Sequence, residues 1–320
     1  MSNVRVLVTG AGGFVGEALV FRLLRDKEFT PVATLRTSSR LQGLCPTISF
    51  DLTRTNTLPA LSDIQVVVHA AARVHVMNEA ATGALQEFRR INVQGTMALA
   101  RHAAASGVKR FIFVSSIKVN GENTQPGRPF TADDLPVPVD PYALSKYEAE
   151  EELKHLSCAT GMELVIVRPP LVYGPGVKAN FLSMMQWVQR GVPLPLGAID
   201  NKRSLVSIGN LVDLLVTCVD HPAAAGHTFL VSDGKDVSIS QLLRSLAKAF
   251  GQSARLLPVP FWLLNLAAGA LGKREVSHRL GESLQVDISK NRELLNWTPQ
   301  ISAEKAIRQT VLHYMENNIK

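Results

Sequence analysis

The chain has 320 residues, of which 46% are hydrophobic and 19% charged, so it can bury a large core and is not an intrinsically disordered protein. Its formal net charge of +7 is spread along the sequence without a dense basic run, which argues against nucleic-acid binding and favours small anionic ligands. Three cysteines without metal-ligand spacing argue against a disulfide framework, and the N-terminus lacks the features of a secretory signal, so we expect a cytoplasmic protein.

Short apolar runs alternate with helix-length segments through the first half of the chain. In chain order we expect strands at 4–10, 31–36, 47–52, 63–72, 110–116 and 162–170, with helices at 13–25, 79–105 and 141–160. Runs rich in Val, Ile and Phe that are separated by helical crossovers are typical of buried parallel strands. The order therefore predicts an α/β protein with a doubly wound parallel sheet.

After Pro169 and Pro170 the elements become shorter, which predicts a smaller mixed C-terminal lobe. We expect residues 1–172 to form the sheet domain and 173–320 mainly the second lobe, with segments such as 203–208 and 227–232 returning to the main sheet. The apolar stretch 258–271 is shorter than the roughly 20 residues that span a bilayer, so we expect no stable membrane insertion. A substrate should lie between the lobes, at the carboxyl ends of the strands.

Glycines follow the first strand at the place where a dinucleotide site begins. Gly10, Gly13 and Gly16 have GxxGxxG spacing, and Phe14 and Val15 open the next helix. Glycine permits a tight turn and lets the backbone approach a pyrophosphate, whose charge is met by the helix N-terminus. The strand, turn and helix together predict a cofactor site.

The residues at the end of the second strand indicate whether the site prefers NAD(H) or NADP(H). An acidic residue there binds the ribose of NAD, whereas Arg36 can hold a 2′-phosphate, with Arg40 assisting. This favours NADP(H), with NAD(H) as the alternative if Arg36 is only a solvated side chain. Asp51, followed by Leu52, is a candidate contact for the adenine, although a turn-forming aspartate at a strand end has the same signature.

Tyr142 and Lys146 stand four residues apart on the helix expected at 141–160, downstream of Ser115 and Ser116. This spacing places a phenol and an ammonium on one helix face, where the positive charge favours the tyrosinate. Such a pair can move a proton while a hydride moves elsewhere.

Several ordered segments give the chain a family resemblance: VVVHAAA, INVQGT, FVSSIKVNGE, PYALSKYEAE, VRPPLVYGPG, NKRSLVSIGNLVD and DISKNRELLNWTP. With the glycine motif, they resemble the extended short-chain dehydrogenase/reductase family of nucleotide-sugar epimerases, dehydratases and ketoreductases. The resemblance runs nearly end to end. It implies an NAD(P)-binding Rossmann domain, a UDP-sugar substrate in the second lobe, and a homodimer formed through the helices at 79–105 and 141–160.

The resemblance also implies roles for individual residues. Ser116 would bond the reacting sugar oxygen, Tyr142 would exchange its proton, and Lys146 would bind the nicotinamide ribose. Asn92 matches a position that supports the surroundings of the lysine, although backbone bonding explains it equally well. The implied cofactor contacts are Gly10, Gly13, Phe14, Val15, Gly16, Arg36, Asp51, Leu52, Ala70, Ala71, Ala72, Asn92, Tyr142 and Lys146. The implied substrate contacts are Ser116, Lys118, Asn180, Arg203 and Arg274, and no metal is expected.

Residues after Ser116 narrow the reaction. Ile117 and Lys118 stand where dehydratases of the family carry an Asp-Glu pair, and Asn120 replaces the tyrosine of the epimerase VYG pattern. The segments around Ser116 and Tyr142 are similar to those of reductases in this family. This similarity favours an NADP(H)-dependent 4-ketoreductase of a UDP-4-keto-6-deoxy-N-acetylhexosamine, which makes a UDP-N-acetylquinovosamine type product for surface polysaccharide. The alternative is a UDP-hexose or UDP-N-acetylhexosamine 4-epimerase with bound NAD, and a catalytically silent cofactor-sensing regulator is a minor one.

Overall fold

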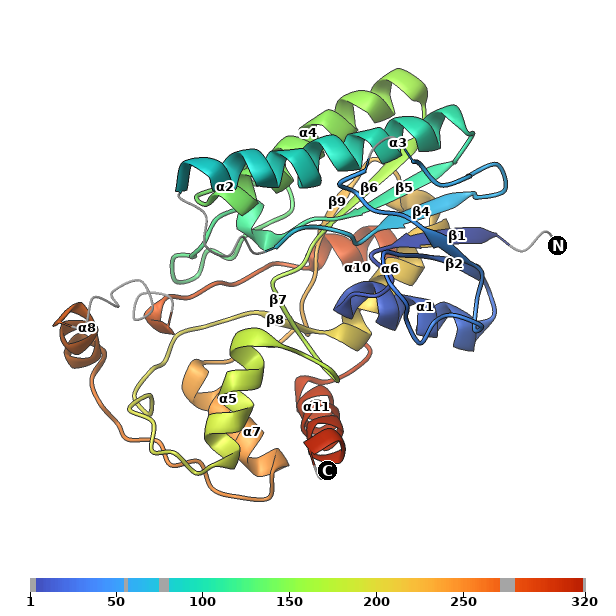
Figure 1. Cartoon of the computed structure of the whole chain (residues 1–320). Helices are drawn as coiled ribbons and strands as arrows, with labels where there is room; N and C mark the ends of the chain where they lie inside the picture. The colour runs from blue at the N-terminus through green and yellow to red at the C-terminus, as the bar shows by residue number, and fades with distance from the viewer. Residues whose placement is uncertain (1–3, 55–56, 75–80, 271–279, 319–320) are drawn as a thin grey trace.

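A seven-stranded parallel sheet forms the centre of the molecule (Figure 1). The computed structural model describes residues 4–54, 57–74, 81–270 and 280–318. In spatial order the strands are β3 (Thr47–Ser49), β2 (Thr30–Leu35), β1 (Arg5–Thr9), β4 (Val66–His69), β5 (Arg110–Val114), β6 (Glu163–Arg168) and β9 (Thr228–Leu230). Every neighbouring pair is parallel, which confirms the doubly wound sheet expected from the alternating elements.

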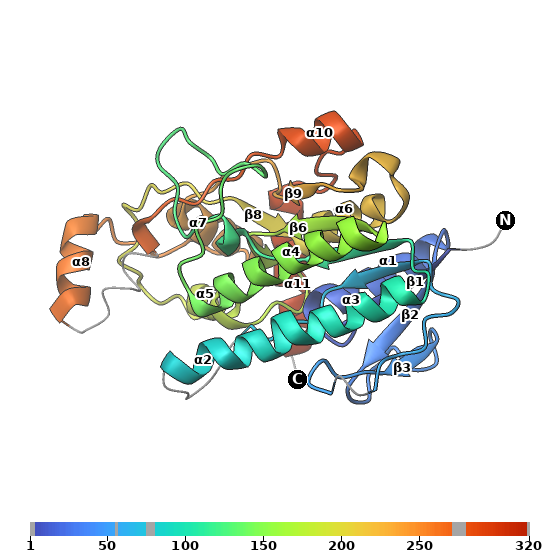
Figure 2. The same ribbon diagram turned by 90° about the horizontal axis from the view of Figure 1, so that it is seen from above.

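Helices cover both faces of the sheet (Figures 1 and 2). One face carries α1 (Phe14–Asp26) and α6 (Ile208–Asp220), and the other carries α2 (Ala81–Phe88), α3 (Thr96–Ala105) and α4 (Pro141–Thr160). Two apolar clusters fill the layers, one between the sheet and α1 with α6, the other between the sheet and α3 with α4. Because both faces are covered, all four residues of β4 are buried, which explains its continuous apolar run.

The helix expected at 79–105 is interrupted in the structure. Between α2 and α3 lies a π-helical segment, η1 (Arg89–Gly95). Gly95, the last residue of this segment, lies close to the backbone of Leu52. A Cβ at position 95 would be only 2.7 Å from the Leu52 carbonyl oxygen. Single π-turns occur often at functional sites, and η1 carries Asn92.

The second lobe packs below the sheet domain in Figure 1. Its apolar core lies among α5 (Ala179–Gln189), α7 (Ile239–Ala249) and α11 (Ala303–Asn318). The segment at 227–232 adds β9 to the main sheet, whereas the segment at 203–208 forms β8 (Leu205–Ser207), which pairs with β7 (Leu171–Tyr173) in a separate two-stranded sheet. β8 cannot join the main sheet beside β6 because β9 occupies that edge.

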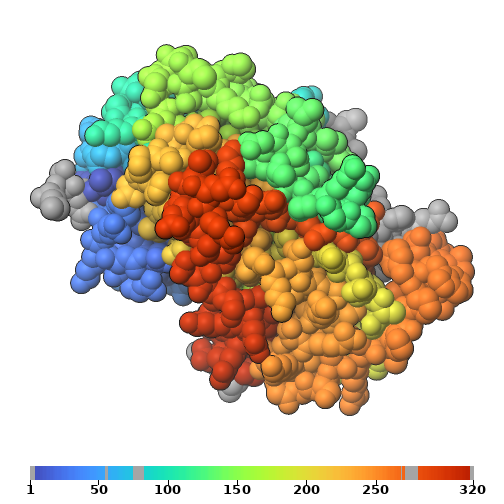
Figure 3. Space-filling view, turned by 180° about the vertical axis from the view of Figure 1, so that it is seen from behind, coloured from blue at the N-terminus to red at the C-terminus, as the bar shows by residue number. Residues whose placement is uncertain are grey.

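The remaining described elements are short. They are α8 (Phe261–Ala270), α10 (Ser289–Leu295) and the 3₁₀ turns η2 (Ile117–Val119) and η3 (Pro222–Ala224). Figure 3 shows the last part of the chain, in orange and red, extending from α8 across the face where the lobes meet. Among the described residues, no helix combines the length and apolar character needed to span a membrane. The helices expected at a dimer contact, α3 and α4, lie side by side, and the dimer itself stays a prediction.

Candidate active site

The glycine turn after β1 approaches the neighbouring strand end more closely than any side chain would allow. Gly10 has a φ of +67°, and a Cβ on it would lie 2.8 Å from the backbone N and Cα of Ala71. The amide of Gly13 donates to the carbonyl of Gly10 at 2.8 Å. Gly13 is the N-cap of α1 and supplies no side-chain cap, so the positive end of the helix dipole points out of a bare turn.

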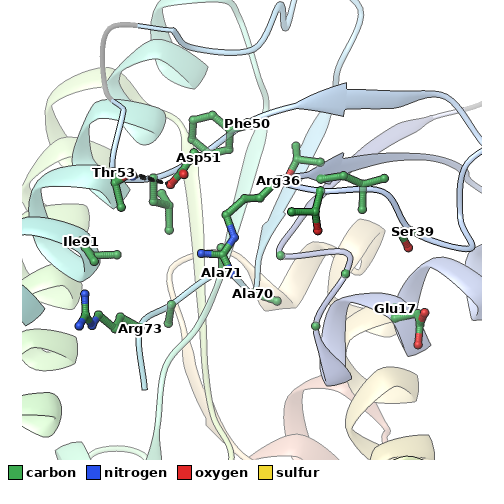
Figure 4. A pocket seen from close by; sticks show the side chains of 18 of the residues that line it. Glu17, Arg36, Ser39, Phe50, Asp51, Thr53, Ala70, Ala71, Arg73 and Ile91 are labelled. Carbon is green, nitrogen blue, oxygen red and sulfur yellow. Dashed lines mark hydrogen bonds between the residues drawn. The ribbon is translucent and has the colours of Figure 1, made fainter. Parts of the chain in front are cut away.

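A cavity of about 830 Å³ opens at this turn, along the carboxyl ends of β1, β2 and β4 (Figure 4). Eight of the predicted cofactor residues line it: Gly10, Gly13, Arg36, Asp51, Leu52, Ala70, Ala71 and Ala72. Phe14, Val15, Gly16, Asn92, Tyr142 and Lys146 are not part of its wall. The sequence reasoning did not include Glu17, Phe50, Thr53 and Ile91, which also line the cavity. Phe50, Thr53 and Ile91 neighbour predicted residues in the chain and could have been found from that adjacency.

Charged side chains of both signs surround the cavity. Figure 4 shows the Arg36 side chain reaching into it toward Ala71, with Asp51 beyond. The carboxylate of Asp51 accepts from the amide and hydroxyl of Thr53, each at 2.9 Å. These bonds lower the pKa of Asp51, and the charge of Arg36 adds to the effect.

Arg40 has a partner of its own at the cavity wall. Its guanidinium donates to both carboxylate oxygens of Glu17, at 2.7 and 2.6 Å, and lies over the ring of Phe21. The expected help of Arg40 to a 2′-phosphate therefore competes with a bidentate ion pair. The wall beside Arg36 thus holds a carboxylate, Glu17, in addition to the expected positive charge.

The three predicted catalytic side chains come from two elements that meet at the carboxyl edge of the sheet. Ser116 follows β5 and precedes η2, while Tyr142 and Lys146 lie in the first two turns of α4. Helix α4 begins where the sequence predicts it, because Asp140 accepts from the amide of Ala143 at 2.7 Å and Pro141 fills the first helical position. Burial raises the pKa of Tyr142 and the Ser116 side chain opposes this rise, so the two side chains act on each other across the two elements.

Burial dominates the protonation of this group. It raises the pKa of Tyr142 to about 12, with the charge of Asp140 adding and the Ser116 side chain opposing. Burial also lowers the pKa of Lys146 to about 7, although Glu150 favours its charged form. Lys146 is 1% exposed, and its Nζ lies 3.9 Å from the centre of the Phe113 ring. The tyrosinate expected from spacing alone is thus opposed by desolvation of both groups.

Asn92 connects the strand end of β4 to the catalytic helix. Its Oδ1 accepts from the amide of Arg73 at 2.8 Å, and its Nδ2 donates to the Arg73 carbonyl and to Ser145 Oγ, both at 3.0 Å. Ser145 in turn donates to the carbonyl of Tyr142 at 2.7 Å. Asn92 is buried and lies outside the cavity, so the geometry makes it a support of the first turn of α4.

Replacing Asn92 by Ala should destabilise the protein by about 1–3 kcal/mol, because the buried amide and carbonyl of Arg73 lose their partners. The first turn of α4 loses its anchor at Ser145, so turnover should fall together with stability. Urea unfolding and initial rates measure the two effects. Gln94→Ala is the matched control, since Gln94 is exposed on the same π-helical segment and should change neither.

His69 is buried at the end of β4, and both of its ring nitrogens are engaged in hydrogen bonds within the fold. Its ring nitrogens bond the hydroxyls of Thr9 at 2.7 Å and Thr96 at 3.0 Å. Burial, with the charge of Lys146 adding, lowers the pKa of His69 to about 3, so the ring is neutral at physiological pH. Its bonds tie β1, β4 and α3 together beside the glycine turn.

The predicted substrate residues are spread over several elements. Lys118 lies in η2 and binds the carboxylate of Asp140, Asn180 is exposed in the first turn of α5, and Arg203 donates to the carbonyl of Glu282 at 3.0 Å. Arg274 lies outside the described residues. Within the described part of the chain, no three His, Cys, Asp or Glu side chains are grouped to hold a metal ion.

Comparisons with known proteins identify the family of the chain. Residues 6–232 match the model of the NAD dependent epimerase/dehydratase family. A UDP-glucose 4-epimerase of Vibrio cholerae is 47% identical over 315 residues, covering 98% of this chain and 96% of that protein. Two solved structures share the fold at 20% identity: the Bordetella bronchiseptica enzyme WbmG in complex with NAD, with a TM-score of 0.78 and coverage of 100% and 96%, and the UDP-N-acetylglucosamine 4-epimerase of Bacillus cereus, with a TM-score of 0.77 and coverage of 99% and 98%.

Proposed function

The chain belongs to the NAD dependent epimerase/dehydratase family, and from this membership and the geometry of the candidate site we propose that it is a UDP-sugar 4-epimerase that works with bound NAD(H). The proposed substrates are a UDP-hexose or a UDP-N-acetylhexosamine. One observation carries the proposal: Tyr142 and Lys146 lie one turn apart on α4 at the carboxyl edge of the sheet, where burial raises the pKa of the phenol and Ser116 opposes this rise. The UDP-glucose 4-epimerase compared above supports the choice of reaction.

The cavity fits a dinucleotide. Gly10 leaves no room for a Cβ beside Ala71, so the backbone itself forms the wall where a pyrophosphate would lie against the start of α1. Asp51, Leu52 and Ala70 to Ala72 would hold the adenosine and nicotinamide ends. The bound dinucleotide supplies a hydride acceptor and donor for one carbon of the sugar.

The proton is handled by the chain's own side chains. Tyr142 would take the proton of the sugar 4-hydroxyl and return it after the sugar has presented its other face. Ser116, which opposes the rise that burial causes in the pKa of Tyr142, would donate a second bond to the same sugar oxygen. Lys146, when charged, lowers the cost of the phenolate that burial otherwise opposes.

The ketoreductase expected first from the sequence has weaker support. Its basis was a resemblance to reductases of this kind, supported by a 2′-phosphate site expected at Arg36 with Arg40 assisting, and Arg40 is paired with Glu17 instead. Arg36 is exposed, and Asp51 brings negative charge to the same cavity. An intact Ser116, Tyr142 and Lys146 set likewise speaks for an enzyme rather than a regulator.

We expect Arg36 to contribute little to the bound cofactor. Arg36→Asp should retain NAD and lose any remaining affinity for NADP, because a carboxylate bonds ribose hydroxyls and repels a 2′-phosphate. Acid release of the cofactor followed by mass spectrometry identifies it in wild type and variant. A wild-type protein that holds NADP, and loses it by tenfold or more in Arg36→Asp, would contradict the preference for NAD.

A cofactor-free assay tests the reaction. Purified protein is given UDP-glucose or UDP-N-acetylglucosamine without added dinucleotide, and the product sugars are resolved by chromatography and NMR. Interconversion with the 4-epimer is the expected result. Parallel samples contain UDP-4-keto-6-deoxy-N-acetylglucosamine with NADPH or NADH, and consumption of reduced cofactor there, without interconversion in the first set, would replace the epimerase by the ketoreductase.

A further inference from the structure

Lys118 and Asp140 form an ion pair that spans the two elements of the candidate active site. The Lys118 ammonium contacts Asp140 Oδ2 and lies 3.4 Å from Glu122 Oε1. Lys118 belongs to η2, two residues after Ser116, and Asp140 lies two residues before Tyr142. The pair therefore joins the segment that carries Ser116 to the start of the helix that carries Tyr142, as the bond between Ser115 and Glu150 does further along α4.

Lys118 and Asp140 also each take part in a helix-capping hydrogen bond close to Ser116 or Tyr142. The amide of Lys118 donates to Ser116 Oγ at 3.3 Å, so Ser116 caps η2. Asp140 Oδ1 accepts from the amide of Ala143 at 2.7 Å and caps α4 with Oδ2 left for Lys118. The Asp140 carboxylate thus caps the beginning of α4 and also binds the ammonium of Lys118, two residues after Ser116.

We propose that Lys118 and Asp140 are positioning residues: their ion pair holds the segment of Ser116 against the start of α4, and Lys118 cancels the charge of Asp140 beside Tyr142. This deepens the proposed function, on which it rests, and gives Lys118 a task other than the sugar contact implied by resemblance. The side chains of Lys118 and Asp140 are 38% and 28% exposed, so either can be replaced without burying an unpaired charge.

The charges around Tyr142 set the direction of the expected effects. Along its own segment, Lys146 lies one turn after Tyr142, and the N-cap Asp140 lies two residues before it. Lys118 of η2 contributes an ammonium that is paired with Asp140 and lies close to Glu122. The neighbour from α2 is the uncharged ring of Phe88. Asp140 raises the pKa of Tyr142. Removing Lys118 leaves that carboxylate uncompensated, whereas removing the charge of Asp140 leaves the ammonium in place.

The test compares Lys118→Met with Asp140→Asn, which keeps the helix cap because Asn is a good N-cap residue. In Lys118→Met the acid limb of the kcat profile should move to higher pH, and kcat at neutral pH should fall roughly three- to tenfold with little change in KM. In Asp140→Asn the acid limb should move to lower pH. Lys154→Met is the matched control, since Lys154 forms an exposed pair with Glu151 on the same helix and should leave the profile unchanged.

Opposite shifts separate this role from a structural one. Loss of a merely structural ion pair would lower activity in both variants and move neither limb, and a sugar contact by Lys118 would raise KM with an unmoved profile. Either result overturns the proposal.

A second readout needs no substrate. With [¹³Cζ]tyrosine, the four tyrosine signals can be resolved and Tyr142 assigned from Tyr142→Phe. The phenol should begin to ionise at lower pH in Asp140→Asn than in wild type, and at higher pH in Lys118→Met. If these shifts occur in a protein that epimerises no UDP-sugar, the proposed function is wrong and the proposed role of the ion pair is supported. If the phenol titrates equally in all three proteins, the role of the ion pair is refuted and the proposed function is unaffected.

Discussion

Tyr142→Phe should lower kcat by about 10²- to 10⁴-fold, the usual contribution of a positioned acid or base. The variant loses one hydroxyl, which Ser116 influences and which would exchange the sugar proton. The ring keeps its edge contact with Phe88, whose centre lies 5.9 Å away, so the fold and the cofactor cavity should persist. We therefore expect a folded, cofactor-bound and nearly inactive protein.

Three measurements on this variant separate chemistry from folding: initial rates, the thermal unfolding midpoint and the amount of cofactor that remains bound. Tyr147→Phe, on the same helix, is the control and should stay within about twofold of wild type, as substitutions away from sites usually do. Undiminished turnover in Tyr142→Phe would remove Tyr142 from the mechanism, whatever the substrate proves to be.

Gly16→Ala should abolish cofactor retention, with a loss of about tenfold or more in affinity and about 1–3 kcal/mol in unfolding free energy. A Cβ at position 16 would lie 2.3 Å from the Gly10 carbonyl oxygen and 2.9 Å from Ala11 Cα. Both contacts are with backbone, so only a displacement of α1 from the turn can relieve them. Because Gly10 and Gly13 form the cavity wall, that displacement reshapes the site.

Gly12→Ala is the matched control for stability. A Cβ there would meet only a methyl group of Leu35, at 3.8 Å, which is an ordinary packing distance. Denaturant unfolding and cofactor titration should show a stable Gly12→Ala protein beside a weakened Gly16→Ala protein. A Gly16→Ala protein that unfolds at the wild-type midpoint and holds its cofactor would show that α1 is not locked to the turn.

Local signals made much of the candidate site predictable. Asp140, Pro141 and Gly161 mark the ends of α4, and the helix runs from residue 141 to residue 160 as expected. The glycine spacing predicted Gly10 and Gly13, the strand ends predicted Arg36 and Asp51, and the family resemblance added Leu52, Ala70, Ala71 and Ala72, all of which line the cavity. These successes share a cause: caps, turns and parallel strand ends are determined within a few residues of the chain.

Long-range pairings were beyond such reasoning. Glu17 and Arg40 are 23 residues apart and Lys118 and Asp140 are 22 apart, and no spacing rule connects them. Whether Arg36 and Arg40 both serve a phosphate depends on which carboxylate lies nearby, which only the packing of α1 against the loop after β2 decides. The place of β8 was likewise open, because its apolar pattern suits either sheet and the occupied edge of β6 excludes it from one.

The sequence alone predicts the doubly wound sheet, the glycine turn and the pair of Tyr142 and Lys146. Each of these features depends on the periodicity or the spacing of residues that are close together in the chain. Only the folded chain determines how acidic that phenol is and how it is held. Burial raises the pKa of Tyr142 and lowers that of Lys146, Asp140 and Ser116 act on Tyr142 from two separate elements, and Lys118 is paired with Asp140. Desolvation and charge act through space, so they depend on the neighbours that tertiary packing brings together.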